Sequence, residues 1–413
     1  MSEESHMHES TIDRTELVER KAILALGGAV RLPAGFLLPF KISRSTAGPG
    51  AGFSSVAIGF DRFRVKKSIS YDSGEFDLVQ SEDGMLSLYR GGKLFIADIS
   101  LLPIVRHCPG QAFFNLDSRC EYRCAFCSSP RLPEKDLKNM TTEKILELLE
   151  ESLSLQHFGT VSFTSGVIVS IDETIERMVD VVSSVHRKYP DLRIGVEPYV
   201  STEEHVVALK EAGANEIKLN VQCATDELFG RICPDLDRDN ILEMLKISVK
   251  IFGKGNVTSN IIYGFRETDD DVTNAIEELC KIGVIPGLRA LRINDYNRQP
   301  LIDAVGPLEK SDPDRMVRLA EIQKDLMSRY GLDTRTSKTM CLECGCCDIV
   351  PFRDIRSSLF LDDSIYRINY LADRGPPRHL YRVPTYDVSL FDTTALHYSR
   401  NAWICILART HID

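Results

Sequence analysis

Seven of the twelve cysteines in this 413-residue chain fall into two short clusters. The first cluster holds Cys120, Cys124 and Cys127, and the second holds Cys341, Cys344, Cys346 and Cys347. In a reducing compartment, such close spacing indicates metal binding rather than disulfide bonding. The remaining cysteines are scattered, and we expect them to be small buried hydrophobic residues: Cys108, Cys223, Cys233, Cys280 and Cys405.

The charge balance excludes several classes of protein. Lys and Arg total 50 against 60 Asp and Glu, giving a formal net charge of −10. A field of this sign disfavours nucleic acid and anionic membrane as general partners. No apolar run reaches the roughly 18 residues that span a bilayer, and the N-terminal residues lack the apolar stretch of a secretory signal. We therefore expect a cytoplasmic protein with no nucleic-acid and no membrane partner.

The N-terminal part of the chain divides into a tail and a β-rich region. Residues 1–20 are polar and are predicted to be a flexible tail. Residues 21–107 are rich in glycine and short alternating segments, so they predict a β-rich N-terminal domain. Asp83-Gly84 and Gly91-Gly92 are typical hairpin turns between those segments.

Residues 108–330 alternate short apolar strands with amphipathic helices. This rhythm favours a parallel sheet, either open and doubly wound or curled into a partial barrel. A Cys-rich loop (331–350) and a C-terminal extension (351–413) complete the chain. The predicted strands span 112–116, 160–164, 192–196, 215–221, 256–263 and 287–293.

The first cysteine cluster directly follows the first of these strands. It reads CxxxCxxC, with the aromatic Phe126 just before Cys127. Three thiolates from one loop can hold three irons of a [4Fe-4S] cube, which leaves the fourth iron to an exogenous chelate. A zinc site would need a fourth ligand, for which His107 and Cys108 are poorly placed. The end of a first barrel strand is also where such folds place their chemistry.

These features resemble the radical S-adenosylmethionine (SAM) superfamily. The resemblance implies a partial (β/α)6 barrel, a [4Fe-4S] cluster ligated by Cys120, Cys124 and Cys127, and SAM bound to the open iron. It also implies an electron donor such as a ferredoxin. Reductive cleavage of SAM would then give a 5′-deoxyadenosyl radical that abstracts hydrogen from a substrate.

The resemblance assigns further positions to SAM. Thr164, Ser165 and Gly166 stand where the family carries a Gly-Gly-Glu-type turn, although the acidic residue is missing here. The run from Ile262 to Glu267 resembles the family's GxIxGxxE motif. The candidates for binding SAM lie in the cluster loop and on or after the later strands: Phe126, Thr164, Ser165, Gly166, Glu197, Asn220, Gln222, Ile262 and Gly264.

Tyr122, inside the cluster loop, has two interpretations. It is either a packing aromatic or a phenol that reaches the open iron when SAM is absent.

The second cluster reads CxxCxCC. Four thiolates from Cys341, Cys344, Cys346 and Cys347 suit one tetrahedral ion, a mononuclear iron or zinc with a structural role. If one of the adjacent pair does not bind, Cys233 or Cys280 is a candidate for the fourth ligand. The alternative is four unrelated thiols.

The arrangement of the chain resembles the radical SAM methanogenesis marker family. It combines a β-rich extension, a radical SAM core and the segment CLECGCCDIVPFRD. That resemblance implies a cobalamin-dependent C-methyltransferase acting on an sp3 carbon of an arginine, in the α subunit of methyl-coenzyme M reductase or a peptide of it. One SAM would supply the methyl group through cobalamin, and a second SAM would supply the radical. Asp295 is a candidate partner for the substrate guanidinium.

The sequence has no Asp-x-His-x-x-Gly motif to supply an axial histidine to cobalamin. The C-terminal extension is therefore the candidate cobalamin-binding region, with aromatic residues Tyr366, Tyr370, Tyr381, Tyr386, Tyr398 and Trp403. Two alternatives remain: another radical SAM peptide-modifying maturase with an auxiliary metal site, and a non-enzymatic metal-binding scaffold. Cobalt content separates the methyltransferase from the maturase, and SAM cleavage separates both from the scaffold.

Overall fold

A computed structural model describes residues 14–38, 40, 55–104, 106–156 and 158–355. The aromatic residues proposed for cobalamin, Tyr366 to Trp403, and Cys405 lie outside these ranges. Among the helices of the described ranges, none combines the length and the hydropathy needed to cross a bilayer.

The N-terminal region is a closed β-barrel preceded by helix α1 (Arg14–Leu26). The strands follow the order β1-β3-β2-β6-β5-β4, and the parallel pairing of β1 with β4 closes the ring. The hairpins predicted at Asp83-Gly84 and Gly91-Gly92 are confirmed, because β5 pairs antiparallel with both β4 and β6. The strands are β1 (Val30–Arg31), β2 (Ser55–Phe60), β3 (Phe63–Ser70), β4 (Phe76–Gln80), β5 (Leu86–Arg90) and β6 (Lys93–Leu102).

The flexible tail predicted for residues 1–20 is wrong from Arg14 onward. Helix α1 begins there because its apolar side chains, including the buried Val18 and Ala22, have a core to pack against. Lys21 is 1% exposed and forms an ion pair with Asp354 at 2.6 Å. A segment that looks polar in sequence thus becomes ordered through a long-range buried pair.

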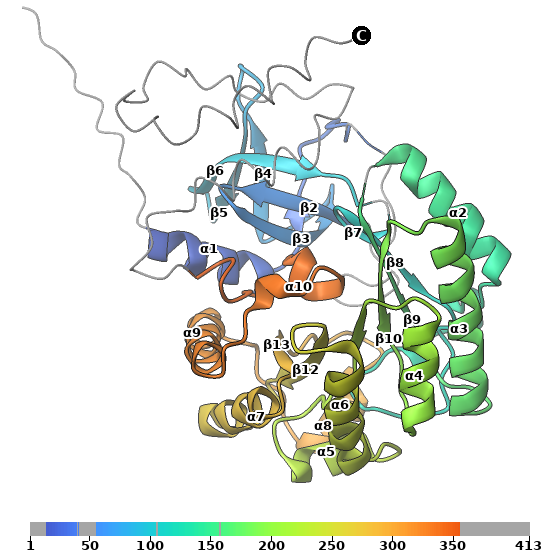
Figure 1. Cartoon of the computed structure of the whole chain (residues 1–413). Coiled ribbons are helices and arrows are strands. Elements are labelled where there is room, and N and C mark those ends of the chain that lie inside the picture. Colours follow the sequence, from blue (N-terminus) through green and yellow to red (C-terminus); the bar gives the residue numbers. More distant parts are fainter. Residues whose placement is uncertain (1–13, 39, 41–54, 105, 157, 356–413) are drawn as a thin grey trace, which may run out of the picture. The chain divides into compact units, whose positions relative to one another are not determined.

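The second region is the predicted partial barrel. Its sheet has the order β13-β12-β11-β10-β9-β8-β7, in which β8 to β13 run parallel and β7 pairs antiparallel with β8. Figure 1 shows the sheet curled, with helices packed along its outer side. The strands are β7 (His107–Cys108), β8 (Gln111–Asn115), β9 (Thr160–Thr164), β10 (Arg193–Glu197), β11 (Glu216–Lys218), β12 (Val257–Tyr263) and β13 (Ile285–Ala290).

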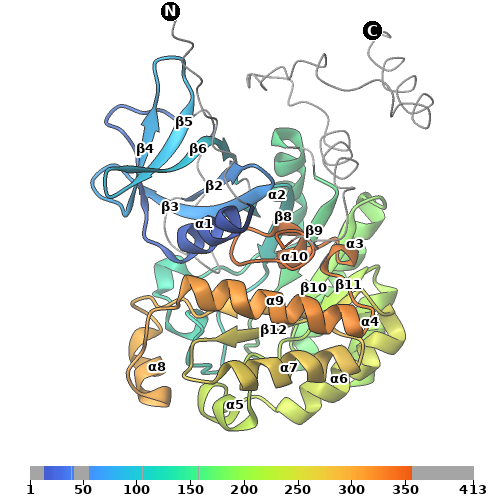
Figure 2. The same ribbon diagram turned by 90° about the vertical axis from the view of Figure 1, so that its left-hand side faces the viewer.

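The helices follow the predicted alternation with the strands. The apolar face of α3 is buried at Ile175, Met178, Val182 and Val185, and the capping box predicted at Thr268 starts α7. Helices α7 and α9 lie side by side, as Figure 2 shows. The helices are α2 (Thr142–Leu155), α3 (Ile171–Lys188), α4 (Glu203–Glu211), α5 (Asp226–Ile232), α6 (Arg238–Phe252), α7 (Asp269–Lys281), α8 (Arg298–Val305), α9 (Pro313–Arg329) and α10 (Met340–Cys344).

The Cys-rich segment, residues 337–348, packs against the sheet through one buried carboxylate. Glu216 of β11 is fully buried and accepts hydrogen bonds from Ser337 Oγ at 2.8 Å and Lys338 N at 2.8 Å. It also accepts from Thr339 N and Thr339 Oγ1, at 3.2 and 2.8 Å. A Cβ on Gly195 of β10 would lie 2.4 Å from Thr339 Oγ1, so only glycine permits this approach.

We expect Glu216→Ala to lower the free energy of unfolding by about 3 kcal/mol or more, because three buried donors and one partly buried donor lose their acceptor. Urea denaturation measures the change, and limited proteolysis tests whether residues 337–348 become accessible. Glu211→Ala, at an exposed position of α4, is the matched control and should leave both readouts unchanged. Equal behaviour of the two variants would contradict the assigned role of Glu216.

Candidate iron–sulfur and SAM site

The loop after β8 carries Cys120, Cys124 and Cys127, and its first half is fixed to the segment after β9. Gly166 N donates to Asp117 O at 2.8 Å, and Glu121 N donates to Val167 O at 2.8 Å. A Cβ at Gly166 would lie 1.9 Å from Arg119 O, so no other residue allows the two segments to approach this closely. Gly166, predicted as a SAM contact, therefore also supports the cluster loop.

The buried carboxylate of Asp117 fixes the start of the same loop. It accepts from Arg119 Nε at 2.9 Å and Nη2 at 2.6 Å, and Arg177 Nη1 approaches to 3.3 Å. Burial raises the pKa of Asp117, but the hydrogen bonds from these arginines outweigh burial and hold the pKa below its usual range. The ionised carboxylate thus remains a firm acceptor.

The second half of the loop is held by the segment after α5 and by the loop after β13. Ala125 N donates to Ile232 O at 2.7 Å, and Arg123 pairs with Asp235 at 2.9 Å. Asn297 Nδ2 donates to Phe126 O at 2.9 Å. The cluster loop is therefore fastened by three neighbouring segments of the barrel mouth.

The three cysteines of the cluster loop are buried or half-buried. Cys124 is 8% exposed, and Cys120 and Cys127 are half-buried. Burial raises the pKa of Cys120, with further contributions from the neighbouring Cys127 and Cys124 thiols. Within the described ranges, no three His, Cys, Asp or Glu side chains lie close enough to hold one ion. In a cubane each cysteine binds a different iron, so the chemistry of this donor set suits three irons of a [4Fe-4S] cluster.

Several residues predicted to bind SAM meet inside the barrel. Asn220 Nδ2 donates to Glu197 Oε1 at 2.7 Å, and Thr164 Oγ1 donates to Glu197 O at 2.9 Å. Lys218, which is 3% exposed at its side chain, forms an ion pair with Glu197 at 2.8 Å. Lys218 was missed by the sequence analysis because a lysine in a short apolar strand gives no signal of its own.

The motif after the fifth strand is held by a carboxylate. Glu267 is 7% exposed and accepts from Gly264 N and Phe265 N, both at 2.8 Å. Arg315 pairs with Glu267 at 2.9 Å. Gly264 has a φ of +110°, which favours glycine, and Ile262 N donates to Gln222 O at 2.7 Å. Glu267 therefore shapes the turn that presents Gly264, while the SAM contact of this turn stays a prediction.

Tyr122 lies near the cluster cysteines and packs against an aromatic neighbour. Its ring meets Tyr199 edge-on with centroids 5.5 Å apart. Burial raises the pKa of the Tyr122 phenol, and Tyr199, Cys120, Asp235 and Cys124 raise it further. Both interpretations of Tyr122 are compatible with this position.

The second cysteine cluster is divided between two environments. Lys218 Nζ lies 3.5 Å from Cys341 Sγ inside the barrel. Cys344 instead packs with Cys108 and Cys346, and these neighbouring thiols lower the pKa of Cys344. The described residues thus do not gather all four thiols around one point, and the tetrahedral ion stays a prediction.

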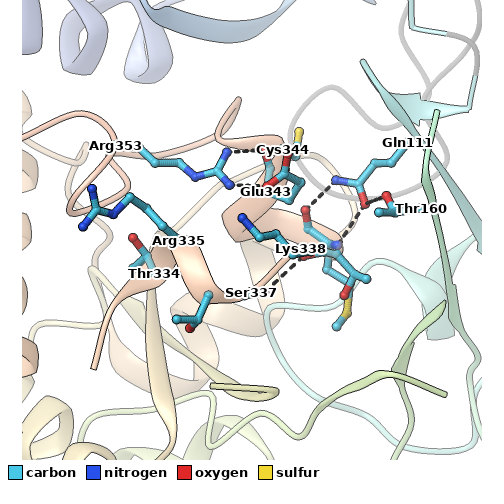
Figure 3. Close-up of polar contacts among 12 residues, drawn as sticks. Gln111, Thr160, Thr334, Arg335, Ser337, Lys338, Glu343, Cys344 and Arg353 are labelled. Atoms are coloured by element: carbon cyan, nitrogen blue, oxygen red, sulfur yellow. Dashed lines mark hydrogen bonds and ion pairs between the residues drawn. The ribbon is translucent and has the colours of Figure 1, made fainter. Parts of the chain in front are cut away.

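Figure 3 shows how the Cys-rich segment is anchored. Gln111 Oε1 accepts a hydrogen bond from Met340 N at 2.9 Å, and Gln111 Nε2 donates to Met340 O at 2.6 Å. Arg353 contacts Glu343. Neither alternative ligand reaches this segment: Cys233 ends α5 near the first cluster loop, where Ile232 O accepts from Ala125 N, and Cys280 lies on α7.

Comparison with known proteins agrees with this site. Residues 115–279 match the family model described as the radical SAM superfamily. The bacteriochlorophyllide c C-7(1)-hydroxylase of Chlorobaculum limnaeum is 27% identical over 52% of this chain and 57% of the hydroxylase, so the chain spans little more than half of that relative. The lipoyl synthase of Leptospira biflexa is 24% identical over 57% of this chain and 74% of the synthase.

Two solved structures are similar at lower identity. The [FeFe]-hydrogenase maturase HydG has a TM-score of 0.46 at 16% identity, covering 58% of this chain and 55% of that one. Methylornithine synthase has a TM-score of 0.45 at 16% identity, covering 65% of this chain and 83% of that one. The family match, read with the three-cysteine loop and the parallel strands β9 to β12 that it covers, identifies residues 115–279 as a region with the features of the radical SAM superfamily. The family implies a [4Fe-4S] cluster and SAM.

We expect Cys127→Ala to abolish both the iron–sulfur absorbance of the reconstituted protein and the reductive cleavage of SAM to 5′-deoxyadenosine, because one iron loses its thiolate. Anaerobic absorption spectra and chromatography of the nucleoside products measure the two effects. Cys280→Ala removes a buried thiol on α7 and should leave both intact. Full cleavage activity in Cys127→Ala would contradict the assigned cluster loop.

If the Tyr122 phenol reaches the open iron, Tyr122→Phe changes the electronic spectrum of the cluster in the absence of SAM. The change should disappear once SAM is added, because SAM then occupies that iron. An unchanged spectrum without SAM assigns Tyr122 to packing against Tyr199.

Proposed function

We propose that the chain is a cobalamin-dependent radical SAM C-methyltransferase that methylates an unactivated sp3 carbon of an arginine. The proposed substrate is the α subunit of methyl-coenzyme M reductase or a peptide of it, and the proposed electron donor is a ferredoxin. The main support is the Cys-rich segment CLECGCCDIVPFRD, on which the finer resemblance rests. Its residue Asp348 accepts from Arg289 at 2.9 Å and from Ala290 N at 3.0 Å, so this segment is hydrogen-bonded to strand β13.

The protein's own residues hold the reacting groups. When bound, the reduced cluster and SAM supply a 5′-deoxyadenosyl radical, and cobalamin supplies the methyl group. Cys120, Cys124 and Cys127 of the cluster loop would hold the cluster, and Glu197 and Asn220 would offer acceptors and donors to SAM at the strand ends. Lys218 balances the charge of Glu197, so that the carboxylate keeps its orientation in a buried setting.

The loop after β13 supplies a candidate contact for the substrate. Asn294 Nδ2 donates to Ser128 Oγ at 3.1 Å, which places this loop beside the cluster loop. Asp295, the next residue, is exposed. A carboxylate in this position offers a charge-assisted pair to a guanidinium, and the net charge of −10 also favours a basic peptide.

Cobalamin enters the proposal through the resemblance alone. Its candidate region, the aromatic residues from Tyr366 to Trp403, lies outside the described residues. We therefore assign no residue of the described barrel to cobalamin and derive no step from its contacts.

The proposal predicts the metal content and the product of the enzyme. After anaerobic reconstitution, we expect about five irons and four sulfides per chain, with stoichiometric cobalt after growth with cobalamin. With SAM and reductant, a peptide containing the target arginine should gain one methyl group on carbon, measured by tandem mass spectrometry. The same peptide with lysine in place of that arginine is the control.

Each alternative outcome has a distinct meaning. Four irons with one zinc would change only the second metal. Absence of cobalt together with SAM cleavage would overturn methyl transfer and favour a radical SAM maturase of another kind. Cobalt without methylation of the arginine peptide would overturn the proposed substrate.

A further inference from the structure

One arginine side chain is hydrogen-bonded to the main chain of the cluster loop. Arg131 follows the last cysteine of the loop and ends a short 3-10 helix (Ser129–Arg131). Its Nη1 donates to Cys127 O at 2.7 Å and to Cys124 O at 3.1 Å, and its Nη2 donates to Arg123 O at 3.4 Å. The guanidinium therefore lies against the carbonyl groups of two of the three predicted iron ligands.

The carbonyl groups that Arg131 binds belong to the turn that joins Cys124 to Cys127. Cys127 N donates to Cys124 O at 3.1 Å, which closes this turn. Arg131 N donates to Ser128 O at 2.9 Å, so the chain turns again directly after the cysteine. A guanidinium binds several oxygens at once because its donors form a planar fork, and such charge-assisted bonds are about twice as strong as neutral ones. Arg131 is thus suited to fixing the spacing of the two ligands.

The positive charge of Arg131 differs from the other arginine charges of the loop because no carboxylate balances it. Arg119 pairs with Asp117 at 2.6 Å, and Arg123 pairs with Asp235 at 2.9 Å. Among the residues that the structure describes, no carboxylate forms an ion pair with Arg131, and its three side-chain hydrogen bonds go to neutral carbonyl groups. Within this part of the chain, an uncompensated positive charge therefore lies beside the cluster loop.

A positive charge in this position favours the reduced form of a cluster held by the loop. One-electron reduction adds one negative charge to the cluster and its thiolates, and the net charge is one of the factors that set the potential of a cluster. The attraction between the charges is strengthened where water is excluded, and Cys124 is buried. Removal of the arginine charge should therefore make the cluster harder to reduce.

We propose that Arg131 is a positioning residue of the iron–sulfur site: its guanidinium holds the turn from Cys124 to Cys127, and its uncompensated charge raises the reduction potential of the cluster. The inference concerns the [4Fe-4S] cluster that the superfamily implies and does not depend on methyl transfer, so the two proposals can fail independently. Substitution separates the two roles. Glutamine removes the charge, whereas lysine keeps the charge but lacks the planar fork.

The first test is the midpoint potential of the reconstituted cluster, followed by electron paramagnetic resonance without substrate. We expect Arg131→Gln to shift the potential to more negative values. At the wild-type midpoint, the ratio of reduced to oxidised cluster should fall severalfold, where tenfold corresponds to 59 mV for one electron. Arg131→Lys should retain most of the wild-type potential, because the positive charge is kept.

The second test is the rate at which the chelator bathophenanthroline disulfonate removes iron from the oxidised cluster. Arg131→Gln and Arg131→Lys should both lose iron several times faster than the wild type, because the turn loses its bonds to the guanidinium fork. Arg187→Gln is the matched control and should change neither readout. Arg187 is exposed in the last turn of α3, which leads into the start of β10, whereas the cluster loop follows the end of the parallel strand β8.

Four outcomes would overturn the proposal. They are a wild-type potential in Arg131→Gln, a shift in Arg131→Lys as large as that of glutamine, an equal shift in Arg187→Gln, and unchanged iron release in Arg131→Lys. If Arg131→Gln fails to hold a cluster, Arg131→Lys decides. Faster iron release at the wild-type potential supports the proposal, and iron release at the wild-type rate overturns it.

Discussion

The buried carboxylate of Glu216 joins strand β11 of the barrel to the Cys-rich segment, residues 337–348. A carboxylate with no access to water is costly to bury, and its burial is tolerated only when donors surround it. Here the donors come from Ser337, Lys338 and Thr339, and Arg193 lies 3.3 Å away. These hydrogen bonds hold Thr339 against Gly195. Two residues further on, Cys341 then lies beside Lys218.

The parts of the fold that the sequence predicted are those encoded locally. The order of the strands, the capping box at Thr268 and the position of the cluster loop all follow from patterns within a few residues. Strand β11 is shorter than predicted, Glu216–Lys218 instead of 215–221, because the chain bends toward Gln222, whose φ of +60° is not a strand conformation. Helix α1 was missed because its stability depends on the distant Asp354.

The thiol contacts show the limit of spacing as a guide. The tight CxxCxCC pattern predicts one shared ion, yet α10 turns Cys341 toward Lys218, while Cys344 packs with Cys108 from β7. Likewise, Cys233 looked like an isolated hydrophobic residue until the fold placed the end of α5 near the first cluster loop, where Ile232 O accepts from Ala125 N. No local pattern encodes a partner more than a hundred positions away, so these pairs needed the structure.

The hydrogen bonds that fasten the cluster loop differ in what they require of the sequence. Three of them join backbone atoms on both sides: Gly166 to Asp117, Glu121 to Val167, and Ala125 to Ile232. A backbone bond does not depend on which side chain the residue carries, apart from the glycine that the close approach at Arg119 demands. Side chains of these segments that make no bond to the loop are therefore free to differ, so the surface of the barrel mouth can change while these backbone bonds are kept.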